Sequence, residues 1–140
     1  MPEIYFFTEQ TSFVLKQKSL VKHWISNCIG SEKCSFSTIN FIFCSDKYLL
    51  NLNKSYLNHS TLTDIITFDY SVKNQLSGDI FISIERVKEN AKSLKINNKN
   101  EVHRVMIHGV LHLCGYGDKS LKEKDLMRKR EDKYLSLRTF

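Results

Sequence analysis

The chain has 140 residues and a mass of 16.4 kDa, which suits a single domain over residues 1–140 and excludes a second substantial one. Hydrophobic residues make up 41% of the chain and charged residues 26%, a composition that can bury a core and excludes a disordered polymer. The formal net charge is +6, and the segment from Lys119 to the end contributes +4 of it. This basic excess is compatible with a nucleic-acid partner but does not establish one.

The sequence carries no recognisable membrane or export signal. No run approaches the roughly 18 consecutive apolar residues of a membrane-spanning helix, and the first residues lack the basic and apolar regions of a signal peptide. We therefore expect a cytoplasmic protein without membrane association. The cysteines form no Cys-x-x-Cys pair, so we expect reduced thiols.

The predicted elements follow one another closely, because the only proline is at position 2 and no stretch has the composition of a linker. Alternating and β-branched residues predict strands over 4–7, 37–44, 64–70 and 79–84. Helical spacing of apolar residues predicts helices over 20–28 with a stop at Gly30, from a cap at Asp46 through Leu52, and over 84–94, 102–114 and 121–137. The order is βαβαββααα, whose opening is typical of a right-handed parallel crossover. We therefore predict an α/β fold in which helices pack on a small mixed four-stranded sheet.

Two histidines stand out in the otherwise apolar segment from Val105 to Cys114. His108 and His112 are four residues apart, a spacing at which two side chains project from one helix face and can reach one metal ion. Either histidine alone would more often be a core residue held by hydrogen bonds. As a pair, they favour a metal site.

Asp118 is the predicted third ligand. Gly115 can end the helix in a left-handed conformation and Gly117 can turn the chain back, which brings Asp118 within reach. The string His-x-x-x-His-x-x-Gly-x-x-Asp has the spacing of the extended zinc motif of metzincin proteases. The alternative is that Asp118 caps the next helix, which is predicted to begin near Ser120.

Gly109 follows the first histidine, at the position where those proteases carry a glutamate as general base. A conventional metalloprotease is therefore disfavoured. We interpret the missing carboxylate as leaving room beside the metal for a bulky anionic substrate such as a phosphodiester. A zinc ion can lower the pKa of water to about 7 without that base.

The motif from His108 to Tyr116 resembles that of the YbeY endoribonucleases. Three weaker segments occur in the family's order: Leu52-Asn53 followed by Tyr56, Thr63-Asp64-Ile65-x-x-Phe68, and Gly78-Asp79-Ile80. The resemblance spans most of the chain and implies a single-strand-specific, metal-dependent endoribonuclease that acts in small-subunit (16S) rRNA 3′-end maturation and ribosome quality control. It implies ribosomal RNA and the ribosome or small subunit as partners, no DNA, and one Zn²⁺ per chain, for which His108, His112 and Asp118 are the expected ligands.

Two positions depart from the family pattern. Most members look like they end the metal motif with a third histidine, where this chain has Asp118, although a carboxylate oxygen is also an acceptable zinc ligand. Many members carry an arginine, thought to assist RNA binding or catalysis, after the tyrosine that matches Tyr56. This chain has Leu57 there, and Lys54 or His59 is only a guess at the replacement. No catalytic residue beyond the metal ligands is assigned.

Other charged residues are weaker candidates. Two basic groups could track an RNA backbone, although a solvated helix face is the ordinary interpretation of each: Lys88, Lys92 and Lys95, and Arg128, Lys129 and Arg130. Asp64 and Asp79 open predicted strands and could orient a ligand histidine, but turn and capping roles are expected.

Three functions therefore compete. The leading hypothesis is a zinc-dependent endoribonuclease. The alternative is a non-catalytic RNA-binding ribosome-assembly factor with a structural metal, which the leucine at position 57 favours. The third is a peptidase, which would need a substitute for the missing base.

Overall fold

The computed structural model describes residues 1–58 and 61–140. Its strands are β1 (Glu3–Glu9), β2 (Ser35–Cys44), β3 (Ile65–Asp69) and β4 (Gln75–Ser83). Its helices are α1 (Lys18–Ser31), α2 (Asp46–Leu57), α3 (Ile84–Leu94), α4 (Asn98–Leu113) and α5 (Leu121–Ser136). The predicted order βαβαββααα is confirmed.

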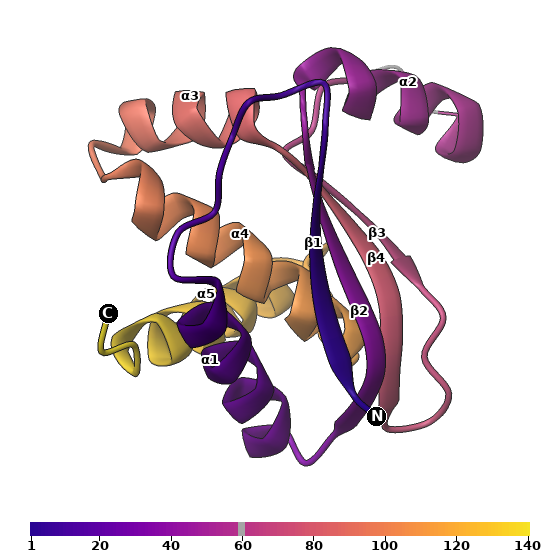
Figure 1. The fold of residues 1–140 in the computed structure, drawn as a ribbon, viewed down its shortest axis with the longest axis vertical. Coiled ribbons are helices and arrows are strands. Elements are labelled where there is room, and N and C mark those ends of the chain that lie inside the picture. The colour runs from indigo at the N-terminus through magenta and orange to yellow at the C-terminus, as the bar shows by residue number, and fades with distance from the viewer. Residues whose placement is uncertain (59–60) are drawn as a thin grey trace.

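The four strands form one mixed sheet in the order β1-β2-β4-β3. β1 and β4 both pair with β2 in parallel, and β3 lies antiparallel to β4 at the edge. The opening β1-α1-β2 unit is thus the parallel crossover that the sequence predicts, and β3 and β4 form an antiparallel hairpin (Figure 1).

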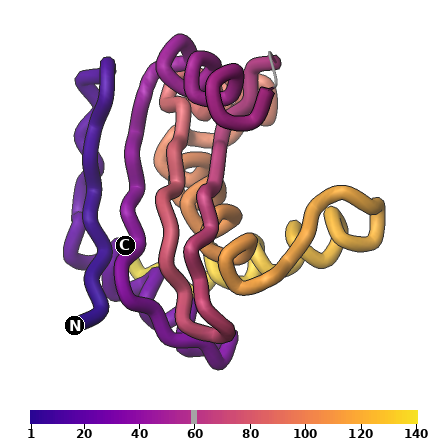
Figure 2. The backbone as a smooth tube through the Cα atoms, turned by 90° about the vertical axis from the view of Figure 1, so that its right-hand side faces the viewer, coloured from indigo at the N-terminus to yellow at the C-terminus, as the bar shows by residue number. Residues whose placement is uncertain are grey.

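Helices cover the two faces of this sheet unequally. Figure 1 shows α1, α4 and α5 on one side of the strands, and Figure 2 shows α2 across one end of the sheet. The main core lies under the larger helical layer and includes the fully buried Phe41, Ile80, Met106 and Tyr134. The apolar surface of α4 therefore faces the sheet, which leaves its remaining surface free for polar side chains.

Short polar side chains set the starts of several helices. The hydroxyl of Ser45 accepts a hydrogen bond from the backbone of Tyr48, so Ser45 caps α2 and the predicted cap at Asp46 is wrong by one residue. The predicted stop at Gly30 is also early, because α1 continues to Ser31 and the left-handed residue is Lys33. Among the residues described, no helix is long and apolar enough to cross a bilayer.

Candidate metal centre

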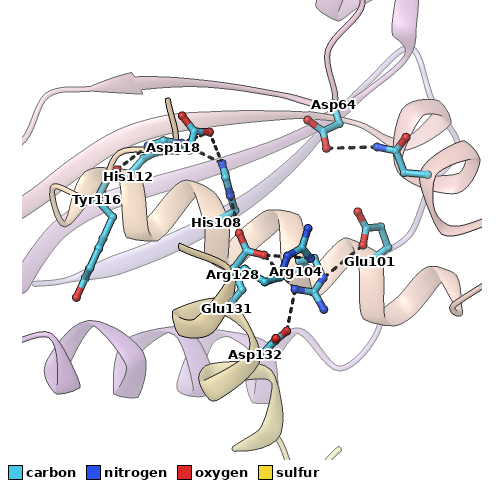
Figure 3. A network of polar contacts seen from close by, with 11 residues as sticks. Asp64, Glu101, Arg104, His108, His112, Tyr116, Asp118, Arg128, Glu131 and Asp132 are labelled. Atoms are coloured by element: carbon cyan, nitrogen blue, oxygen red, sulfur yellow. Dashed lines mark hydrogen bonds and ion pairs between the residues drawn. The ribbon is translucent and has the colours of Figure 1, made fainter. Parts of the chain in front are cut away.

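Three side chains converge at the C-terminal end of α4. The Nε2 atoms of His108 and His112 are 2.9 Å apart, and Oδ2 of Asp118 lies 3.2 Å from the first and 3.3 Å from the second. One ligand atom from each residue falls within 4.8 Å of the others, so the three could hold one metal ion. The structure thus brings together the three residues that the sequence predicts (Figure 3).

Local backbone geometry accounts for this convergence. The i, i+4 spacing stacks the two imidazoles on one face of α4, and Gly115, with φ of 106°, then ends the helix in the left-handed region. The helix that follows is capped by Ser120, which forms a capping box with Glu123. Asp118 is therefore not the cap of α5, and its carboxylate points back toward the histidines.

The outer nitrogen of each imidazole is occupied by an acceptor. Nδ1 of His108 lies 2.7 Å from Oε2 of Glu131, and Nδ1 of His112 lies 2.9 Å from the backbone oxygen of Tyr116. Because a carboxylate and a carbonyl can only accept, each neutral imidazole donates from Nδ1 and keeps its lone pair on Nε2. When both imidazoles are neutral, two Nε2 lone pairs and a carboxylate oxygen face one another. A divalent cation fits this set of donors.

Charge and burial shift the pKa values of the groups around the three converging residues in opposite directions. Burial opposes protonation of His108, but the hydrogen bond and the negative charge of Glu131 outweigh it and raise the pKa of the imidazole. Burial also raises the pKa of the Asp64 carboxyl, which His108 only partly offsets. The amide of Asn90 donates a hydrogen bond of 3.4 Å to Asp64. Asp64 thus lines the same cavity as the two histidines, but its carboxylate is hydrogen-bonded to Asn90 and not to either imidazole.

The three residues open into a cavity of about 950 Å³ between β3, α2, α4 and α5. Its lining is mixed, with the apolar Leu57 and Val105 as well as the basic Arg104, Lys124 and Arg128. The side chains of His108, His112 and Asp118 are 20%, 28% and 40% exposed, so the centre is accessible from this cavity. An open centre of this kind can admit a substrate, whereas a purely structural zinc site is usually closed by protein ligands.

Gly109 has a different role from the one that the sequence suggests. A Cβ atom at this position would lie 2.8 Å from Cγ2 of Ile80 and 3.0 Å from Cδ1 of Ile65, both on the sheet. The position one residue after His108 therefore faces the core, because successive helical residues are about 100° apart. The expectation that Gly109 leaves room beside the metal is wrong, and the glycine instead allows α4 to pack closely on the sheet.

The remaining predicted candidates are dispersed. Asp79 accepts a hydrogen bond of 2.9 Å from Asn40 on the sheet, away from the cavity. The lysines at 88, 92 and 95 are exposed and line no part of the cavity. In the other basic group, Arg128 lines the cavity, whereas Lys129 pairs with Asp125 and Arg130 with Glu32. Leu57 lines the cavity but Lys54 does not, and the guess at His59 lies outside the described residues.

Two polar residues next to the histidines were missed by sequence reasoning. Glu131 is only 5% exposed and contacts His108, and Nη1 of Arg104 lies 3.0 Å from the other oxygen of Glu131. Arg104 precedes His108 by four residues, so helical spacing could have placed it on the same face. No sequence signal places Glu131 there, because its position depends on how α5 crosses α4.

Comparisons with known proteins agree with this geometry. The family model described as Endoribonuclease YbeY matches residues 4–138. The chain is 51% identical to Endoribonuclease YbeY of Cytophaga hutchinsonii over 98% of its own length and 96% of that protein. It is also 51% identical to the protein of the same name from Flavobacterium psychrophilum, with 94% of each chain covered.

A solved structure has a similar fold. The solution structure of TM1509 from Thermotoga maritima matches with a TM-score of 0.68 and 25% identity, and the match covers 96% of this chain and 87% of that one. The family predicted from the histidine motif is confirmed by these relatives and by the family model. The chain belongs to the YbeY endoribonuclease family.

Proposed function

We propose that this protein cuts single-stranded RNA as a metal-dependent endoribonuclease, with His108, His112 and Asp118 as the ligands of one zinc ion. The observation that carries the proposal is the meeting of two imidazole Nε2 atoms and one carboxylate oxygen in an accessible cavity. Membership of the YbeY endoribonuclease family supports the reaction, and the nitrogen and oxygen donors suit zinc.

Some residues of the cavity would hold the metal, and others would contact the substrate. When bound, zinc supplies a Lewis acid that polarises a phosphoryl oxygen and lowers the pKa of water. Lys124 and Arg128 of α5 line the cavity one helical turn apart and can contact RNA phosphates. Arg104 is less available for this, because its guanidinium already lies 3.0 Å from both Glu131 and Asp132.

We further propose that the physiological substrate is the 3′ end of 16S rRNA, processed on the ribosome or its small subunit in the cytoplasm. The family supports this substrate. The basic residues of the C-terminal segment support binding to a large polyanion. The whole chain acts in this proposal as one domain.

A cleavage assay tests the proposal directly. Zinc-loaded protein and its His108→Ala variant are incubated with a fluorescent single-stranded RNA and with the same RNA in a duplex. We expect the wild-type protein to cut the single strand, a chelator to stop it, and His108→Ala to lose both zinc and cleavage. His23→Ala is the matched control, because His23 is exposed on α1 outside the cavity.

The same assay separates the competing functions. Binding of RNA without cleavage by zinc-loaded wild-type protein would favour the non-catalytic assembly factor. Full RNA cleavage by His108→Ala would refute the metal-dependent mechanism. Cleavage of casein in place of RNA would favour a peptidase, which we do not expect because Gly109 takes the place of the glutamate base and faces the sheet.

A further inference from the structure

Glu131 is a buried carboxylate that links His108 of the candidate metal centre to Arg104. It comes from α5, its side chain is 5% exposed, and its two oxygens have different partners. Oε2 lies 2.7 Å from Nδ1 of His108, and Oε1 lies 3.0 Å from Nη1 of Arg104. A carboxylate with so little access to water needs such partners, since burial of an unpaired charge is costly.

The two ligand histidines are oriented by different means. His112 donates to a backbone carbonyl, that of Tyr116, which carries no net charge. His108 donates to the carboxylate of Glu131, whose negative charge makes the imidazole a stronger electron donor at Nε2. The strength of His108 as a ligand therefore depends on a side chain that is not itself near the ion, whereas that of His112 does not.

Arg104 holds this carboxylate in place from the opposite side. It lies one helical turn before His108 on α4, so a single face of the helix presents both partners of Glu131 (Figure 3). Asp132 lies 3.0 Å from the same guanidinium nitrogen, and Arg128 lies 3.6 Å from Oε1 of Glu131. Glu131 is thus fixed between cations and the imidazole, with little freedom to rotate away.

We propose that Glu131, held by Arg104, is a positioning residue that fixes the orientation and tautomer of His108 and strengthens its bond to the metal. The proposal rests on the proposed function only in taking His108 as a metal ligand. It assigns no contact between Glu131 and RNA. The carboxylate acts through the histidine, and its effect appears in metal affinity before any substrate is added.

Zinc affinity, measured by competition with a chromophoric chelator, tests this role without RNA. We expect Glu131→Ala to weaken zinc binding by about 10- to 100-fold, the range typical for loss of such a partner. Glu131→Gln keeps an acceptor oxygen but loses the charge, so its zinc affinity should lie between those of Glu131→Ala and the wild type. Asp132→Asn is the matched control, because Asp132 contacts the same arginine but is 59% exposed and does not reach His108.

A second readout separates positioning from a merely structural role. The visible absorption bands of the cobalt-substituted protein report the ligand field at the ion, and we expect them to shift in Glu131→Gln but not in Asp132→Asn. Zinc affinity and cobalt bands that match wild type in both Glu131 variants, with only a lower melting temperature, would overturn the proposal. If Glu131→Ala does not fold, Glu131→Gln alone decides, with weakened zinc binding expected and wild-type binding overturning it.

The outcomes also distinguish this proposal from the proposed function. Zinc-loaded wild-type protein that cuts no RNA would refute the nuclease and leave the affinity comparison intact. Wild-type protein that binds no zinc would refute the shared metal site, and with it both proposals.

Discussion

Two histidines of α4, one toward each end of the helix, have opposite hydrogen-bonding partners. Near the N-terminal end, His103 is 3% exposed, packs against the rings of Trp24 and Phe140, and lies with Nδ1 2.7 Å from the guanidinium of Arg138. Five residues later, Nδ1 of His108 faces a carboxylate. Arginine can only donate, so Nδ1 of His103 accepts, whereas Nδ1 of His108 donates. Histidines of one helix therefore have opposite hydrogen-bonding roles at Nδ1, as an acceptor in the core and as a donor at the candidate metal centre.

This difference also shifts the pKa values of the two imidazoles in opposite directions. Burial, together with the charges of Arg138 and Lys99, lowers the pKa of His103 to about 4. Contact with Glu131 overcomes burial and raises the pKa of His108. One end of the helix thus excludes positive charge, while the other attracts a cation.

Replacing one histidine near each end of α4 is the strongest test of this difference. We expect His112→Ala to weaken zinc binding by more than about 100-fold, beyond the loss of an orienting partner, because a ligand atom is removed. His103→Gln should leave zinc affinity within twofold of wild type, since its side chain lies outside the cavity. Competition with a chelator measures both zinc affinities. A comparable decrease in the two variants would contradict the view that only the C-terminal part of α4 binds the metal.

Lowering the pH should destabilise the folded protein through the buried His103. The pKa of His103 in the folded state is about 4, below the unfolded value of about 6.5, so the unfolded chain binds more protons between these values. The contribution of His103 to stability is therefore full above pH 6.5 and is lost as the pH falls toward 4, by about 2 kcal/mol between pH 7 and 5.

Urea denaturation of wild type and His103→Gln over this pH range measures that contribution. Both proteins share all other titrating groups, so the difference in unfolding free energy isolates His103. We expect this difference to decrease as the pH falls from 7 to 5. A constant difference for His103→Gln would show that the imidazole titrates normally.

Substitution of two arginines, one at each region, tests the same difference through smaller effects. Arg128→Gln should weaken RNA binding several-fold and reduce the slope of log affinity against log salt by about 1, because Arg128 lines the cavity. Arg138→Gln should leave RNA binding unchanged and lower the unfolding free energy by about 1–3 kcal/mol, because its bonds to His103 and Asn100 are lost. Fluorescence anisotropy with chelator present measures binding without cleavage, and equal effects of the two substitutions would contradict the comparison.

The sequence predicts the elements and the three converging residues well, because both depend on local periodicity. The spacing of His108 and His112 and the left-handed turn at Gly115 are properties of one short segment. The strand order is less local, since β3 lies at the sheet edge and β4 pairs in parallel with β2. Glu131 could not be found in the same way, because its contact with His108, 23 residues away on another helix, depends on how the two helices pack and not on a repeat.

The close contact at Gly109 limits what substitution can achieve at this centre. A glutamate introduced there to create a peptidase would push its first carbon into Ile80 and Ile65 before its carboxylate could reach the ion. The backbone would first have to move away from the strands, or the two isoleucines would have to shrink. In this chain, the close packing of α4 on the sheet therefore disfavours a glutamate base at position 109, and a substitution of His108, His112 or Asp118 would not relieve that contact.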